Sequence, residues 1–327
     1  MKTEDQERLQ RLAGDLPPDV RLHLALTRHD LSDQFHAYGR QLHEALPDID
    51  LVSAVHNEAA PPWLETETGI RFHALPEGDK LDGLIAALRP PEKNEASLPE
   101  AQREWLMQMP LPVEIRLYIA PACPFCPSAL QQWVTLARAG RQLRLVVIDG
   151  ALFPEMARQD NVQAVPTLVL DRHLRWAGQI PVDAVLEQLA TRDLGRLDSE
   201  ALDGLIKEGL ADQVAQAMTA AGRLFPAIFD LLTHPKWPAR LGAMVVLETI
   251  AASDPGLAAE VLPTLRQRYD QLEDAVKGDV LYIIGETGDH RMTSFLKDAA
   301  AASRNPEVRQ AAREALGSIQ QRLDGAP

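Results

Sequence analysis

The sequence predicts a multidomain fold in which two tandem α/β units precede an all-α solenoid. Between residues 99 and 195, strand-like and helix-like segments follow the order β-α-β-α-β-β-α, and a fainter copy of that order comes before it. From residue 196 onwards the pattern changes to amphipathic helices with a regular repeat. We therefore predict three domains, covering residues 1–97, 98–195 and 196–327.

The composition narrows the class of protein before any motif is considered. The 327 residues include 47 acidic and 33 basic side chains, a net charge of −14. An acidic chain is repelled by phosphate backbones, so nucleic acid is not an expected partner. No stretch reaches the ~18 continuous apolar residues of a membrane span. The charged segment Met1–Leu12 also lacks the apolar core of a signal peptide. We expect a cytoplasmic protein without a membrane partner.

The elements of the second α/β unit follow from its apolar periodicity. They are a helix over 100–109, a strand over 113–119, a helix over 124–139, a strand over 143–148, a helix over 153–159, strands over 167–170 and 174–177, and a helix over 182–191. The strand over 143–148 is almost fully apolar, which is typical of a strand buried on both faces of a sheet.

The first α/β unit repeats this order. Its predicted elements are a strand over 21–27, a helix over 32–46 with Ser32 as N-cap, a strand over 49–55, a hairpin of 62–66 and 70–74 around Gly69, and a helix over 80–88. The segment Pro62–Leu64 aligns with Pro166–Leu168 at an offset of 104 residues, which indicates an internal duplication. The run Arg89–Asn94, with two prolines, is the predicted linker.

The third domain carries its own repeat. Its predicted helices cover 200–208, 210–220, 225–232, 239–247, 257–271, 275–285, 292–302 and 308–317. Arg240, Lys277 and Arg309 occupy equivalent positions 37 and 32 residues apart, where they either bridge repeats or form an anion-binding ridge. The pattern resembles HEAT repeats of the short, PBS-lyase-like kind. Helical solenoids present extended concave surfaces, so we expect a protein partner on the HEAT-like surface.

Cysteine usage singles out one site. The chain has only two cysteines, Cys123 and Cys126, in the segment Cys-Pro-Phe-Cys between a predicted strand and a predicted helix. A helix N-terminus carries partial positive charge and unpaired N–H groups, which favour a thiolate at Cys123. Pro124 suits the first helical position. Cys126, one turn further on, is placed to resolve a mixed disulfide formed at Cys123.

Two other interpretations of the cysteine pair remain open from these residues. The cysteines could be inert core thiols, or they could bind a metal or an iron–sulfur cluster together with ligands from a second chain or glutathione. We expect no metal. The sequence lacks a phosphate-binding glycine loop, so we expect no bound flavin or nicotinamide and no other cofactor. Electrons would then come from an external flavoprotein or thiol reductant.

A proline supports the redox interpretation. Pro166, in Val165-Pro166-Thr167, begins the third strand of its unit, 43 residues after Cys123. The order of elements, the Cys-x-x-Cys spacing and this Val-Pro-Thr segment together resemble the thioredoxin superfamily. The resemblance implies a cis Pro166 that faces the cysteine pair and, with its two neighbours, binds the substrate backbone. Pro124 and Phe125, between the cysteines, complete the predicted substrate-binding residues.

The tandem arrangement narrows the resemblance over residues 20–192. A cysteine-free thioredoxin-like unit followed by one with Cys-x-x-Cys resembles the N-terminal domain of the alkyl hydroperoxide reductase flavoprotein. It also resembles glutaredoxin-like protein disulfide oxidoreductases, whose Cys-Pro-x-Cys-Pro motif matches Cys123–Pro127. There are departures from these patterns. The loop Arg28–Ser32 has no cysteine, Leu117 replaces a buried acidic proton acceptor, and a glutathione-type Gly-Gly-Asp signature is absent after Trp176.

These observations predict a thiol–disulfide oxidoreductase that acts on a protein substrate, with its partner chosen by the helical repeats. One alternative is a non-enzymatic, redox-sensing adaptor that binds through the HEAT-like surface. Another is an electron-transfer module for a peroxiredoxin. The histidines of the first unit add no site. His29, His36 and His43 recur every seven residues, but His36 and His43, which share a helix face, are about 10 Å apart along the axis, too far to bind one ion together. We expect histidines in this unit to be solvated or to cap helices.

Overall fold

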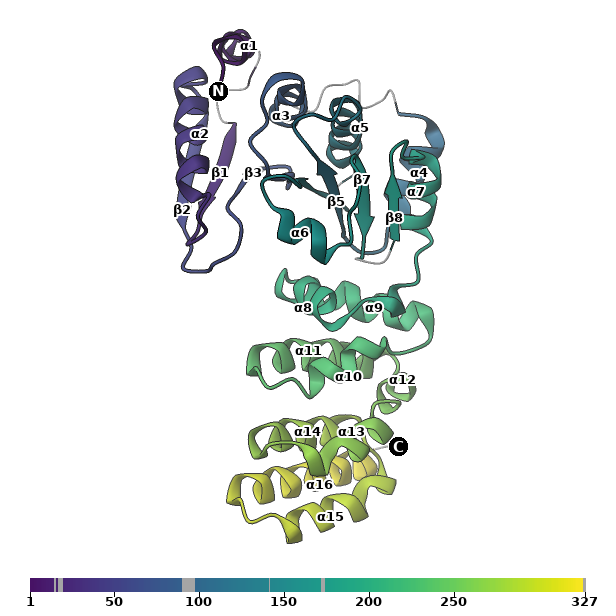
Figure 1. Cartoon of the computed structure of the whole chain (residues 1–327). Coiled ribbons are helices and arrows are strands. Elements are labelled where there is room, and N and C mark those ends of the chain that lie inside the picture. Colours follow the sequence, from purple (N-terminus) through teal and green to yellow (C-terminus); the bar gives the residue numbers. More distant parts are fainter. Residues whose placement is uncertain (15, 17–19, 90–97, 141, 172–173, 326–327) are drawn as a thin grey trace. The chain divides into compact units, whose positions relative to one another are not determined.

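The computed structural model describes the chain except for residues 15, 17–19, 90–97, 141, 172–173 and 326–327 (Figure 1). The chain divides into two compact units, Met1–Arg192 and Asp193–Pro327. The predicted boundary at residue 97 lies outside the described residues, so the division into three domains stays a prediction.

The compact unit Met1–Arg192, which contains both predicted α/β units, is a mixed α/β structure. Its elements are α1 (Thr3–Ala13), β1 (Arg21–Leu26), α2 (Ser32–Ala45), β2 (Asp50–Val55), β3 (Trp63–Thr66), β4 (Arg71–His73), the 3-10 helix η1 (Gly78–Lys80), α3 (Leu81–Leu88), α4 (Glu100–Gln108), β5 (Val113–Ile119), α5 (Cys126–Ala139), β6 (Leu143–Asp149), α6 (Pro154–Gln159), β7 (Thr167–Leu170), β8 (Leu174–Ala177) and α7 (Val182–Ala190). Each predicted strand is present, and its ends agree with the prediction to within one residue.

In the described part of this unit, the strands form one eight-stranded sheet in the order β2-β1-β3-β4-β6-β5-β7-β8. Each half of this order consists of a parallel pair, β1 with β2 or β5 with β6, followed by an antiparallel hairpin. The first strand of each half also pairs antiparallel with the hairpin's first strand. The two halves therefore have the same strand order and the same strand directions.

A parallel pairing between β4 and β6 joins the halves, with Phe72 opposite Val147. One apolar core continues through both halves, and it includes Phe72, Leu130 and Val147. Helix α3 approaches α5 so closely that a Cβ atom on Gly83 would collide with the side chain of Leu130. The halves thus share one sheet and one core within the described residues.

Two local expectations for the α/β unit are wrong, and one helix of this unit was not expected. Helix α5 begins at Cys126, so Pro124 is not its first helical residue; Pro127 takes a place in the first turn instead. Ser32 is not an N-cap, because its hydroxyl accepts from Thr27 N–H and donates to Thr27 C=O. The charged segment Thr3–Ala13 forms helix α1, which was not predicted, and it buries Leu9 and Leu12 against the core.

The second unit is helical. Its helices are α8 (Ser199–Lys207), α9 (Ala211–Ala221), α10 (Pro226–Leu232), α11 (Trp237–Ser253), α12 (Pro255–Ala259), α13 (Leu262–Arg268), α14 (Asp274–Thr287), α15 (Thr293–Ala302) and α16 (Pro306–Gly325), with 3-10 turns at Leu194–Arg196, Tyr269–Gln271 and His290–Met292. Helices α9, α11, α14 and α16 pack in succession, and the layered arrangement is visible in Figure 1. This arrangement is that of a repeat solenoid.

One predicted helix of this unit is wrong. The single helix predicted over 257–271 is divided into α12, α13 and a 3-10 turn, since Pro263 lacks the N–H that a continuous helix requires. Trp237, at the start of α11, is 55% exposed. The expected bridging of repeats is confirmed for Arg240, which is buried and forms an ion pair with Asp279 of α14.

Candidate redox site

The site lies where β5 ends and α5 begins. Strand β5 is central in the second half of the sheet, between β6 and β7. Its end therefore has a fixed position, and the loop that follows carries Cys123 to the first turn of α5, which begins at Cys126. The backbone N–H of Cys123 donates to the carbonyl of Ala120 at 3.3 Å, which makes this loop a tight turn.

Cys123 and Cys126 form a disulfide, with their Cα atoms 5.5 Å apart. Cys123 is 9% exposed and Cys126 is fully buried, so an incoming sulfur atom can reach only Cys123 without a rearrangement of the site. The backbone N–H of Cys126 donates to Cys123 Sγ at 3.1 Å. In the reduced protein, a thiolate on Cys123 would be stabilised by this N–H at the start of α5.

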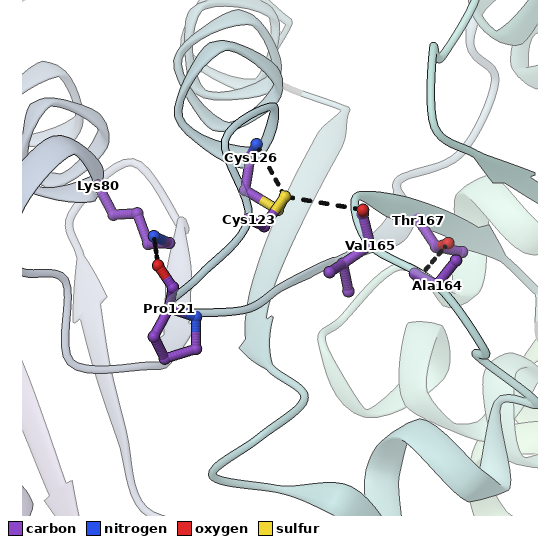
Figure 2. The surroundings of a disulfide bond; sticks show 7 residues. All are labelled: Lys80, Pro121, Cys123, Cys126, Ala164, Val165 and Thr167. Atoms are coloured by element: carbon purple, nitrogen blue, oxygen red, sulfur yellow. Dashed lines mark hydrogen bonds between the residues drawn. A yellow bond between two sulfur atoms is a disulfide. The ribbon is translucent and has the colours of Figure 1, made fainter.

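A second loop, distant in sequence, completes the site (Figure 2). Since β7 runs antiparallel to β5, the beginning of β7 meets the end of β5. The carbonyl oxygen of Val165 consequently lies 3.7 Å from Cys123 Sγ. A thiol at Cys123 would donate to this oxygen, whereas the disulfide sulfur has no proton to donate.

The two residues that follow Val165 are buried. The Val165–Pro166 peptide bond is cis, as the resemblance implied, and Pro166 is buried. Thr167 is also buried, and its hydroxyl donates to the carbonyl of Ala164 at 2.8 Å. Thr167 therefore holds the loop, while Val165 presents its carbonyl to the disulfide.

Pro124 and Phe125, the two residues between the cysteines, are both exposed. The Phe125 side chain is 72% exposed, which is unusual for a large apolar residue. It lies beside the disulfide without belonging to the core, so it offers apolar surface to whatever approaches Cys123.

Two charged residues near the site were not recognised as parts of it from the sequence. Lys80 belongs to η1, which follows the last strand of the first half, yet its Nζ donates to the carbonyl of Pro121 at 2.7 Å (Figure 2). Asp149 ends β6 opposite Ile119 and accepts from the N–H groups of Ala151 and Leu152. Burial raises the pKa of Asp149. No linear motif signals Lys80, because the β4–β6 pairing brings its segment to the cysteine loop.

The corresponding loop of the first half, Arg28–Ser32, lies near an aromatic cluster. The ring of His29 is 5.5 Å from that of Phe153, and the ring of His73 is 5.9 Å from Phe153. His29 caps its turn as expected, since its Nδ1 accepts from Leu31 N–H. His73 departs from the expectation of solvated or capping histidines, because it is buried and burial lowers its pKa to about 4.

Two other kinds of feature are absent from the described residues. No group of three or more His, Cys, Asp or Glu side chains gathers there in a way that could hold a metal ion. In the same part of the chain, no helix combines the length and the apolar character that a membrane crossing requires.

Family comparisons agree with this geometry. Residues 113–191 match the family model of the thioredoxin domain, and residues 225–317 match that of HEAT repeats. The chain therefore contains a thioredoxin-type α/β domain with a CxxC-spaced cysteine pair, followed by HEAT repeats. The resemblance drawn from the sequence is confirmed at this level.

The sequence of this chain is also similar to parts of individual proteins. The chain is 27% identical over 160 residues to the F component of alkyl hydroperoxide reductase from Pseudomonas aeruginosa, an alignment covering 47% of this chain and 31% of that protein. It is 26% identical over 160 residues to an NADH dehydrogenase of Ferdinandcohnia aciditolerans, covering 47% and 30%. The chain thus spans just under a third of the length of these relatives.

A solved structure supports the fold. The crystal structure of a protein disulfide oxidoreductase from Aeropyrum pernix k1 is similar with a TM-score of 0.51 and 19% sequence identity, covering 60% of this chain and 95% of that chain. At this level of identity the likeness concerns the fold alone. The relatives at the sequence level are oxidoreductases, which supports a redox enzyme in general terms.

Proposed function

We propose that the chain is a cytoplasmic thiol–disulfide oxidoreductase that exchanges a disulfide with a protein substrate through Cys123 and Cys126. The observation that carries the proposal is the asymmetry of the pair. Cys123 Sγ is partly accessible and accepts the Cys126 N–H, whereas Cys126 is fully buried behind it. Such an arrangement suits one attacking thiol and one resolving thiol.

The proposed exchange proceeds in two displacements. In the first, the Cys123 thiolate attacks a substrate disulfide, a mixed disulfide forms, and the substrate's other sulfur leaves as a thiolate that takes up a proton. In the second, the Cys126 thiol loses its proton and attacks Cys123 Sγ, which forms the observed disulfide and releases the second substrate thiol. Two electrons pass from the dithiol to the substrate, and an external flavoprotein or thiol reductant returns the pair to the dithiol.

We assign substrate positioning to the residues around the pair. A substrate chain bonded to Cys123 would run beside Val165, whose carbonyl lies 3.7 Å from the sulfur. Pro166 and Thr167 hold that loop in place. Pro124 and Phe125 offer exposed surface on the other side of the sulfur, so an apolar side chain of the substrate would pack against Phe125.

The first half of the sheet is, in this proposal, a second thioredoxin-type unit that has lost its cysteines. The support is the shared strand order and the shared directions of the two halves. The loop Arg28–Ser32 occupies the position of Cys123–Cys126 but carries no thiol. All dithiol chemistry then passes through one pair, and the first half acts as a structural partner.

We assign partner binding to the HEAT repeats. On α11, Trp237, Leu241 and Val245 are spaced four residues apart and are exposed, as is Tyr282 on the neighbouring α14. The Tyr282 hydroxyl donates to Glu248, so a carboxylate borders this apolar stripe. An apolar stripe with an acidic border suits a protein partner whose contact segment carries apolar and basic side chains.

A second candidate function is an electron-transfer module between a flavoprotein reductase and a peroxiredoxin. The favouring observation is the similarity of residues in the α/β unit to the F component of alkyl hydroperoxide reductase. This candidate retains the same dithiol chemistry and predicts rapid exchange with such partners, together with poor turnover of general protein disulfides.

Trapping tests the proposal. The Cys126→Ser variant should accumulate a mixed disulfide at Cys123, which mass spectrometry identifies together with its partner. The Cys123→Ser variant should lose disulfide reductase activity towards insulin with a chemical thiol donor. Retention of activity by Cys123→Ser would reject the mechanism. Absence of wild-type turnover beside tight partner binding would favour a non-enzymatic adaptor.

A further inference from the structure

A lysine from the cysteine-free half contacts the loop that carries the reactive cysteine. Lys80 Nζ donates to the carbonyl oxygen of Pro121 at 2.7 Å, and Pro121 is two residues before Cys123 (Figure 2). Among its contacts within the described residues, Lys80 has no ion-pair partner. Its positive charge therefore stands beside the cysteine loop without direct neutralisation.

The short helix that carries Lys80 is held firmly from the N-terminal helix α1. The carboxylate of Asp5, which is almost fully buried, accepts the Gly78 N–H at 3.1 Å to each oxygen. Arg8 donates to the carbonyl of the same glycine at 2.8 Å. Tyr38 donates its buried hydroxyl to the carbonyl of Pro76. The backbone N–H and C=O groups of Gly78 are thus both hydrogen-bonded, so the position of Lys80 follows from the fold of the first half.

We propose that Lys80 is a positioning residue that holds the Pro121–Cys123 loop and stabilises the thiolate form of Cys123. The proposal rests on the proposed dithiol function and deepens it. It gives the cysteine-free half a direct part in the chemistry, because that half supplies the charge that the cysteine-bearing half lacks at this loop.

The charges around the loop determine the sign of the effect. Asp149 is the nearby carboxylate, and the charge of Lys80 acts on it. Its Oδ1 is taken up by the Ala151 and Leu152 N–H groups, and it does not form an ion pair with Lys80. Asp5 and Asp82 form ion pairs with Arg8. Lys80 consequently places a positive charge in contact with the loop, and this charge favours an anion there.

A stabilised thiolate has a second consequence. Because Lys80 stabilises the reduced, ionised form, it should shift the dithiol–disulfide equilibrium towards the dithiol and make the pair a stronger oxidant. Removal of the charge should therefore act on two linked quantities that are measured separately, the titration of Cys123 and the redox equilibrium of the pair. A merely structural lysine would move neither.

The test uses the full chain in its reduced form. Thiolate absorbance near 240 nm is followed against pH for the wild type, Lys80→Met, Lys80→Gln and Lys80→Arg, with Lys207→Met in the helical unit as a matched control. We expect Lys80→Met and Lys80→Gln to raise the pKa of Cys123 by about 0.5 to 1, a three- to tenfold loss of thiolate at a pH below that value. Lys80→Arg should restore the wild-type titration.

Equilibration with glutathione buffers gives the second measurement. The disulfide form of Lys80→Met should be favoured about three- to tenfold more than in the wild type. Wild-type titration and wild-type equilibrium in both uncharged variants would overturn the proposal, as would an equal change in Lys207→Met. These readouts do not depend on turnover, so a failure here is distinguishable from retained activity in Cys123→Ser, which would reject the proposed function itself.

Discussion

Phe72 of β4 lies opposite Val147 of β6 in a parallel register, and both side chains are buried in one core. This pairing connects the strands that precede Lys80 with the strand that ends at Asp149. The cysteine-free half and the cysteine-bearing half are therefore mechanically continuous, which is why a residue of one half can reach the loop of the other.

Truncation of Phe72 should destabilise both halves together. Removing a fully buried aromatic side chain costs about 3–5 kcal/mol, so Phe72→Ala should lower the free energy of unfolding by that amount. Val52→Ala on the outer strand β2, where the side chain is exposed, is the matched control and should cost less than about 1 kcal/mol. Hydrogen exchange of β1 and β5 amides checks the result. Loss of protection confined to β1 would show that the halves are energetically separate.

Phe125 should contribute to substrate choice without affecting stability. Its side chain is 72% exposed, so Phe125→Ala should leave the unfolding midpoint unchanged. Loss of apolar contact with a protein substrate, about 1–1.5 kcal/mol, should lower kcat/KM for a protein disulfide roughly five- to tenfold. Turnover of a small aromatic disulfide such as dithiobis-nitrobenzoate serves as the internal control and should change less than twofold. An equal loss on both substrates would assign Phe125 to the chemistry of the pair.

Stability of the first unit should decrease as the pH falls from about 6.5 to 4. Burial lowers the pKa of His73 to about 4, against the opposing hydrogen bond to Pro62, and the charges of Arg71 and Arg116 lower it further. The unfolded chain, with an ordinary histidine pKa near ~6.5, binds a proton that the folded protein does not. Protonation therefore favours unfolding in this window by at most about 3 kcal/mol.

The variant His73→Gln should remove this dependence. Urea unfolding at several pH values between 4 and 7 would give a flatter stability curve for His73→Gln than for the wild type. His23→Gln, at an exposed position on β1, is the control and should keep the wild-type slope. Parallel curves for the wild type and His73→Gln would contradict the assignment.

In the helical unit, the Arg240–Asp279 ion pair should contribute more to the free energy of unfolding than the Lys207–Asp203 pair. Its buried guanidinium donates to Asp279 at 2.6 Å and to the carbonyls of His234 and Pro235. Arg240→Met would leave a carboxylate and two carbonyls without this donor, at a cost of about 3–5 kcal/mol. Lys207→Met breaks an exposed pair within α8 and should cost at most about 0.5 kcal/mol. Calorimetry of the full chain would compare the stability of the two variants. Equal losses of stability would mean that the burial of Arg240 does not strengthen its ion pair.

Much of the local structure follows from residue patterns. The alternation in Val113–Ile119 specifies β5 because a strand has a side-chain period of two. The apolar run Leu143–Ile148 specifies β6 because a strand buried on both faces of a sheet needs apolar residues at nearly every position. The cysteine spacing, placed between a strand and a helix, indicated the redox pair. Helix α1 was missed because its two buried leucines are spread among charged residues, a weak signal until a core is present to receive them.

The chemistry proposed for this chain depends on features of its linear order: a single Cys-x-x-Cys pair after a strand, a proline 43 residues later, and a repeat of helices at the C-terminal side. These are properties of local spacing and residue type. The surroundings of the cysteine pair do not follow from local spacing. The Val165 carbonyl beside Cys123, the Lys80 contact with Pro121 and the burial of His73 all depend on strand pairings between distant segments. Register across the sheet is set by packing of the shared core, so a neighbour such as Lys80 emerges only when β4 and β6 lie side by side.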